Sequence, residues 1–195
     1  VSFSAFLVIP NFSAYFQFNA GYPRSRLSLL YLAGGSISFF TMRLMGWLVD
    51  RVGASLVMIA GTIGFALLVW MDVVLGTPLL LPAMAFFILF MIFQPSRAVP
   101  ANTIGTRVPP PEARATYQSL QSSMQHMACA FGAGLSSRML SEQPNHMLEH
   151  MDDVGWLAIV VSLLAPPMMI ILERGVRRRE HYLDEVEEPS PPSVA

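Results

Sequence analysis

The stretch VGASLVMIAGTIGFALLVWMDVVLGTPLLLPAMAFFILFMIFQPS, residues 52–96, contains a single charged side chain, Asp72. Similar stretches cover most of the chain. The segments without Asp, Glu or Arg are 1–23, 27–42, 52–71, 73–96, 115–137 and 154–172. A helix needs about 20 mainly apolar residues to cross a bilayer, and a charge at mid-bilayer is costly. These segments therefore predict an all-α integral membrane protein.

The number and limits of the expected helices follow from the same spacing. We expect six transmembrane helices, with approximate spans 1–18, 27–48, 54–72, 78–98, 115–138 and 154–172. The second span runs past Arg43 because the long stem of an Arg side chain can reach the membrane interface. The six spans form one bundle over residues 1–175. Residues 176–195 become acidic and rich in Pro and Ser, so we predict a disordered cytoplasmic tail there.

The composition excludes several classes of protein. The chain is 53% hydrophobic and 13% charged, whereas soluble domains carry about 25% charged residues. No basic cluster of the kind that binds nucleic acid lies outside the last quarter. Cys129 is the only cysteine, and we expect no metal site and no cofactor. The sequence has no P-loop, Gly-x-Ser-x-Gly or HExxH motif that would support ATP-driven pumping or hydrolysis.

The distribution of arginines predicts the orientation of the bundle. On one side of the expected spans lie nine arginines: Arg43, Arg51, Arg97, Arg107, Arg114, Arg174, Arg177, Arg178 and Arg179. The opposite side carries Arg24, Arg26 and Arg138. Basic residues concentrate in cytoplasmic loops, so the side with nine, which includes the C-terminus, is predicted to be cytoplasmic. The chain starts inside an apolar run without an initiator Met, and we expect it to be cut from a longer protein.

The fifth expected span carries a wide polar side. A 100° helical wheel places its amide, hydroxyl and imidazole groups opposite a row of apolar side chains. The first span has a narrower polar side. The candidate cavity residues are Asn11, Tyr15, Gln118, Ser122, Gln125 and His126. Hydrogen bonding between helices is the alternative explanation, but the width of the polar side favours a substrate cavity. We expect no acidic residue inside a span, and so no buried carboxylate for a proton relay.

The loop between the second and third spans carries a specific motif. Residues 46–53, Gly-Trp-Leu-Val-Asp-Arg-Val-Gly, resemble the G-x-L-x-D-R-x-G signature of the major facilitator superfamily. Transporters of that family have twelve helices and carry the signature after helix 2 and, in degenerate form, after helix 8. The resemblance implies close packing and a tight turn at the glycines, a partner for the Asp and a cytoplasmic Arg. The residues concerned are Gly46, Asp50, Arg51 and Gly53.

A second stretch resembles bacterial drug and sugar efflux permeases of the same superfamily. Residues 97–101, Arg-Ala-Val-Pro-Ala, together with Arg114 and residues 119–125, match their helix 10 to helix 11 segment. Ala115 and Gln121 replace the Gly and Asn usual in that pattern. The resemblance assigns Arg97 and Arg114 to the gating segments. It covers residues 1–175 as helices 7 to 12, one half of a twelve-helix fold that requires a missing N-terminal six-helix half.

The resemblance implies a secondary active transporter, namely proton-coupled efflux of a small molecule such as a drug or sugar by alternating access. The implied partners are a small-molecule substrate, a proton as candidate coupling ion, the lipid bilayer and the N-terminal half. The implied location is the plasma membrane, the bacterial inner membrane. The alternative is a membrane protein without transport activity, either an intramembrane enzyme or an assembly subunit. An enzyme is disfavoured because only His126, Cys129 and hydroxyl groups lie at depth, and no catalytic residue is expected.

The predicted orientation is testable with single cysteines at Asn145 and Ser190 in a Cys129→Ser background. The tail is predicted to be inside, so an impermeant maleimide applied to intact cells is expected to label position 145 and not position 190. Labelling after cell permeabilisation is the control for reactivity at position 190. Labelling of position 190 from outside would overturn the orientation.

Overall fold

The computed structural model describes residues 1–75 and 82–187, and nearly all of them are helical. The α-helices are α1 (Ser2–Val8), α2 (Phe12–Ala14), α3 (Leu27–Val52), α4 (Ala54–Val69), α5 (Ala83–Arg107), α6 (Arg114–Met139), α7 (Met151–Leu163) and α8 (Ala165–Glu187). Short 3-10 turns cover Ile9–Asn11, Arg24–Arg26 and Pro111–Ala113. The π-helical turns Tyr15–Asn19 and Trp70–Val74 extend α2 and α4.

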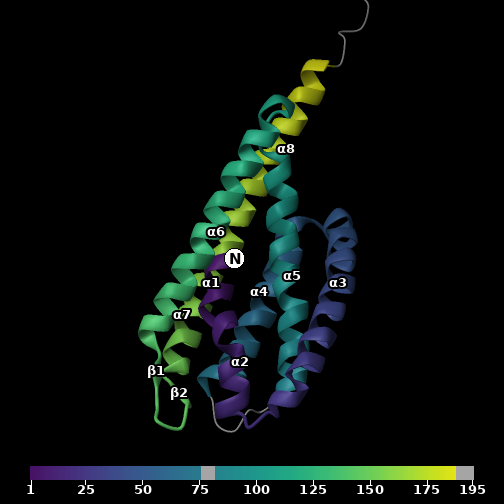
Figure 1. Ribbon diagram of the computed structural model, residues 1–195. Helices are drawn as coiled ribbons and strands as arrows, with labels where there is room; N and C mark the ends of the chain where they lie inside the picture. The colour runs from purple at the N-terminus through teal and green to yellow at the C-terminus, as the bar shows by residue number, and fades with distance from the viewer. Residues whose placement is uncertain (76–81, 188–195) are drawn as a thin grey trace, which may run out of the picture.

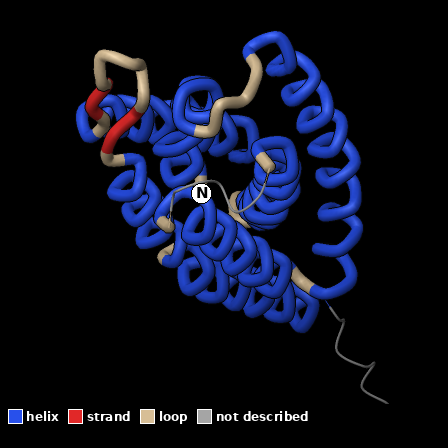
Figure 2. The backbone as a smooth tube through the Cα atoms, turned by 90° about the horizontal axis from the view of Figure 1, so that it is seen from below, coloured by secondary structure: helices blue, strands red, loops and turns tan. Residues whose placement is uncertain are grey.

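The long helices run alternately up and down in one elongated bundle (Figures 1 and 2). α5 packs against both α3 and α4, while α1 packs against α6 and α7. In Figure 1, α3 lies at one edge of the bundle, α6 lies at the other, and α8 extends beyond its neighbours at the top. The chain therefore folds as a bundle of antiparallel helices, with α1 and α4 in the interior.

Four helical segments of the described chain are long and apolar enough to cross a membrane. They are Arg24–Val52, Ala54–Val74, Ala83–Arg107 and Met151–Arg179. They overlap four of the expected spans. The other two, 1–18 and 115–138, are largely helical but are not among these four. Large apolar side chains such as Phe39 and Phe40 on α3 are more than two thirds exposed, an arrangement that a bilayer stabilises and water does not.

Prolines account for two of the differences between the expected and the observed helix ends. α5 continues through Pro95 and Pro100 to Arg107, although the span was expected to end at residue 98. Each proline removes only one backbone donor, and packing on α3 and α4 holds the helix together. The last segment is interrupted at Leu164, so that Pro166 and Pro167 fall in the first turn of α8, where an amide donor is not needed. α8 continues to Glu187, past the expected start of the tail at residue 176, and residues 188–195 lie outside the described chain.

An aromatic cluster fixes the first segment against α5. The rings of Phe12 and Phe90 meet edge to face with centroids 4.7 Å apart, and Phe16 contacts Phe86 and Phe87 in similar geometry. All five side chains are buried. Edge-to-face pairs add about 0.5–1.5 kcal/mol beyond the burial of their surface. The cluster therefore anchors the irregular α1–α2 segment in the core.

A short hairpin joins α6 to α7. Its strands β1 (Ser141–Glu142) and β2 (Leu148–Glu149) pair antiparallel. The side-chain amide of Asn19 donates to the Leu148 carbonyl and accepts from the Leu148 N–H, both at 2.9 Å. Asn19 thus pairs with β2 as a strand residue would, and it ties the hairpin to the end of the first helical segment.

At Gly61 the α4 helix lies against the α5 backbone. A Cβ atom on Gly61 would lie 2.7 Å from the Ser96 Cβ and 3.0 Å from the Ser96 carbonyl carbon. Any side chain there would push two backbones apart. The residue after Ser96 is Arg97, and its guanidinium stacks on Phe65, one turn beyond Gly61. The glycine contact therefore sets the depth at which Arg97 lies.

Gly61→Ala is expected to destabilise the protein by about 1–3 kcal/mol, because the added methyl overlaps the α5 backbone. Gly35→Ala is the matched control, since a Cβ on that α3 glycine meets nothing within 4 Å. The thermal unfolding midpoint of the detergent-solubilised protein is expected to fall for Gly61→Ala and to stay equal or rise for Gly35→Ala. Equal midpoints for the two variants would contradict the close contact.

Candidate functional site

Arg97 lies inside the bundle. Its side chain is fully buried, although the sequence assigned it to a gating segment on the cytoplasmic side. The difference arises because α5 continues beyond residue 98. The guanidinium donates to the Ser4 Oγ at 2.7 Å, lies 3.5 Å from the Gln94 Oε1 and sits 4.0 Å from the centre of the Phe65 ring. Among the described side chains no acid pairs with it, and its Nε has no hydrogen-bond partner there.

Asp72 corrects the expectation that no acid lies inside a span. It is fully buried in the π-helical turn Trp70–Val74, within the apolar segment Ala54–Val74. Its backbone carbonyl accepts a hydrogen bond from the Tyr15 hydroxyl at 3.1 Å. Sequence spacing placed this acid at the boundary between two apolar stretches. In the structure the helix continues past that boundary to Val74, and Asp72 is therefore buried within it.

The two candidate cavity residues of the first span make contacts within the bundle. Asn11 donates from Nδ2 to the Ser136 Oγ of α6 at 2.7 Å and to the Leu7 carbonyl at 3.2 Å. Tyr15 is buried and bonded to the end of α4 through Asp72. Both side chains therefore link helices, and such links stabilise packing in an apolar environment.

The four candidate cavity residues of α6 lie on its surface. Gln118, Ser122, Gln125 and His126 are all exposed. The apolar side of the same helix is exposed as well, with Met124 and Phe131 more than three fifths accessible. Only two residues of α6 are buried: Gly132, which lies against α1, and Ser136, which accepts the hydrogen bond from Asn11. The structure thus does not gather the six predicted cavity residues in one place: two link helices, and four form an open polar strip.

The loop motif forms the turn between α3 and α4. Gly53 has a φ of +96°, which suits glycine, and the chain reverses direction there. Asp50 lies 3.9 Å from Arg107 of α5, and Arg51 stacks its guanidinium 4.2 Å from the centre of the Trp47 ring. At Gly46 the implied close packing is absent, because an added Cβ would meet no described atom within 4 Å.

Glu173 of α8 contacts the turn formed by the loop motif, and the sequence analysis did not predict this contact. Its carboxylate accepts hydrogen bonds from the Ser55 N–H at 2.9 Å and from the Ser55 hydroxyl, and it pairs with Arg177 at 2.8 Å. Ser55 lies in the first turn of α4, so Glu173 satisfies a free amide and complements the positive end of the helix. The spacing of Glu173 and Arg177, four residues apart on a helix, was the available signal.

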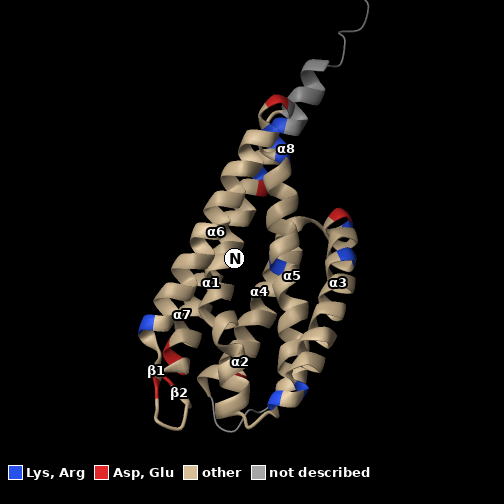
Figure 3. Ribbon diagram, viewed as in Figure 1, with Lys and Arg blue, Asp and Glu red and all other residues tan. Residues whose placement is uncertain are grey.

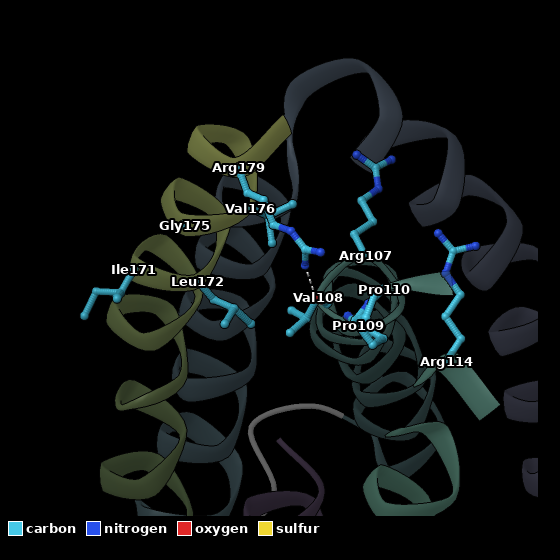
Figure 4. Close-up of a pocket in the computed structure, with 10 residues that line it drawn as sticks. All are labelled: Arg107, Val108, Pro109, Pro110, Arg114, Ile171, Leu172, Gly175, Val176 and Arg179. Atoms are coloured by element: carbon cyan, nitrogen blue, oxygen red, sulfur yellow. Dashed lines mark hydrogen bonds between the residues drawn. The ribbon is translucent and has the colours of Figure 1, made fainter. Parts of the chain in front are cut away.

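The charged residues of the loop motif, together with those of α5 and α8 that approach it, line a cavity of about 440 Å³. The walls come from the ends of α3 and α5, the start of α4 and the middle of α8, and they carry Asp50, Arg51, Arg107, Glu173 and Arg177. In Figure 3 the other charged positions lie mostly toward the ends of the bundle, while the middle of most helices is uncharged. Arg114 is exposed and lines a separate cavity together with Arg107 (Figure 4).

Comparison with known proteins gives one match. A family model described as Major Facilitator Superfamily matches residues 1–193. No curated protein and no solved structure matches the chain.

Glu173→Ala is expected to loosen the first turn of α4, because it removes a buried carboxylate that holds an amide donor. Such charged hydrogen bonds contribute about 1.5–3 kcal/mol, whereas an exposed pair such as that between Asp50 and Arg107 contributes about 0–1 kcal/mol. Hydrogen exchange at the Ser55 amide is therefore expected to be faster in Glu173→Ala and nearly unchanged in Asp50→Ala. Equal exchange rates of the Ser55 amide in the two variants would contradict the capping role of Glu173.

Proposed function

Because the chain belongs to the major facilitator superfamily, whose members are transporters and not enzymes, we propose that it forms part of a secondary active transporter of small molecules. The family match over residues 1–193 carries this proposal, and the four helical segments able to span a bilayer support a multi-pass membrane protein.

We further propose that residues 1–175 are helices 7 to 12, the C-terminal half of a twelve-helix transporter. The antiparallel order of the helical segments supports this assignment, as does the degenerate copy of the loop motif at residues 46–53. Transport then proceeds by rocking of this half against an N-terminal half around a site near the middle of the bilayer. The proposed activity is proton-coupled efflux of a drug or sugar, with the C-terminus in the cytoplasm.

The polar strip of α6 is the proposed wall of the substrate path. Gln118, Ser122, Gln125 and His126 are exposed in this half and are therefore free to face the partner half. Leaving such a strip in lipid without partners would cost several kcal/mol, on the order of 1–3 kcal/mol for each polar group. The opposite, apolar side of α6 suits lipid.

The two buried charges are proposed to serve coupling. Ionisable groups inside a membrane are costly and usually mark ion or substrate pathways. Asp72 supplies a carboxylate at the end of α4 that can carry a proton, and Arg97 holds a positive charge at the contact of α1 with α5. The cluster around Asp50 and Glu173 is the proposed gate that favours one of the two transport states.

Alternating access is testable without knowing the substrate. In a Cys129→Ser background, Gln125→Cys is expected to react with an impermeant maleimide in both right-side-out and inside-out vesicles, because the same path opens to each side in turn. Phe131→Cys, on the apolar side of α6, is the matched control and is expected to react slowly in both. Reactivity of Gln125→Cys from only one side, or from neither, would contradict the proposal.

A further inference from the structure

A second cavity, of about 590 Å³, opens where α5 ends, α6 begins and α8 passes between its apolar and basic parts (Figure 4). It is larger than the cavity enclosed by the loop motif, and its volume lies within the range of about 300–1,000 Å³ typical of small-molecule sites. None of the six candidate cavity residues of the first span and α6 lines it.

The wall of this cavity changes from apolar to basic along α8. Ile171 and Leu172 are exposed apolar side chains at the end of the charge-free segment 154–172. Val108 and Pro109 form the facing apolar wall, at the end of α5. The charged residues of α8 begin directly after Leu172, with Glu173 and Arg174. A ligand that fits both parts needs an apolar portion and a polar head, and it lies where the membrane meets water.

Three arginines from three different segments line the cavity. Arg107 comes from the last turn of α5, Arg114 from the first turn of α6 and Arg179 from α8. Arg179 donates to the Val108 carbonyl at 2.8 Å, which holds it at the cavity edge (Figure 4).

The acidic groups described nearby compensate these charges only in part. Asp50 lies 3.9 Å from Arg107, and both of these side chains are at least half exposed. Glu112, on the turn before α6, forms no ion pair with a described arginine, and Glu173 is engaged by Arg177. The cavity edge therefore carries an excess of positive charge. Guanidinium groups match phosphate oxygens in charge and in geometry.

We propose that this cavity binds an anionic phospholipid, with the phosphate headgroup between Arg107, Arg114 and Arg179 and an acyl chain along Ile171 and Leu172. Basic pockets between transmembrane helices are suited to such headgroups. In this position the lipid bridges the ends of α5, α6 and α8, because all three line the cavity. This proposal concerns the membrane and does not depend on the transported substrate.

The test is lipid binding to the purified full-length protein in detergent, measured by native mass spectrometry with dioleoyl phosphatidylglycerol and dioleoyl phosphatidylcholine. The triple variant Arg107→Gln/Arg114→Gln/Arg179→Gln is expected to weaken phosphatidylglycerol binding at least about tenfold, because it removes the three positive charges proposed to hold the phosphate. The matched control, Arg24→Gln/Arg26→Gln/Arg138→Gln, removes three exposed arginines from the opposite end of the bundle and is expected to retain binding. An equal loss of phosphatidylglycerol binding in the two triple variants would indicate non-specific attraction between charges and would overturn the proposed site.

A second variant fills the cavity without changing its charge. Gly175 lines the cavity and a Cβ there meets nothing within 4 Å, so Gly175→Phe is expected to block the lipid, while Gly35→Phe, equally open on α3, is expected to retain it. Unchanged binding in Gly175→Phe would overturn the proposal. Glycerol 3-phosphate is added as a soluble competitor that carries a phosphate but no acyl chain. If it displaces phosphatidylglycerol at equal concentration, the site binds free phosphate compounds and not a lipid.

Discussion

The contact between Gly61 and Ser96 determines where the most costly group of the structure lies. With α4 and α5 in backbone contact, Arg97 is directed inward, against the Phe65 ring and the hydroxyl of Ser4. A buried guanidinium without a paired acid is expensive unless its other contacts are held in place. α1 provides one of those contacts, and the Phe12 cluster fixes the segment that follows it. The interior of the bundle is therefore organised around one positive charge and the close contact that holds it.

The two ends of the bundle use polar groups differently. At the loop-motif end, Glu173 connects α8 to the first turn of α4 through Ser55, and Asp50 only approaches Arg107. The first of these links is buried and directional, while the second is exposed and loose. Amide and hydroxyl groups such as Asn11 and Tyr15 connect the helices further along. This division leaves the polar strip of α6 exposed in the part of the chain that the structure describes.

Charge spacing predicted the helical, membrane-spanning character of the chain because the bilayer excludes charges from whole stretches of sequence. The helices α3 and α6 begin and end within a few residues of the expected limits 27–48 and 115–138. The prolines misled the estimate for α5, since tertiary packing outweighs the loss of one hydrogen bond. Asp72 and Glu173 were missed for another reason: each lies at the border of an apolar stretch, where sequence alone does not show whether the carboxylate faces water or a neighbouring helix. The family was predicted from the motif at residues 46–53, and the family match over residues 1–193 confirmed it.

The two hydrogen bonds between Asn19 and Leu148 join a surface hairpin to the first helical segment, although 129 residues separate the partners. Elements joined in this way tend to open and close as one cooperative unit. The hairpin is therefore expected to move together with that segment. If the segment tilts, these two bonds carry the hairpin with it, and a fluorescent probe on the loop is expected to report that motion.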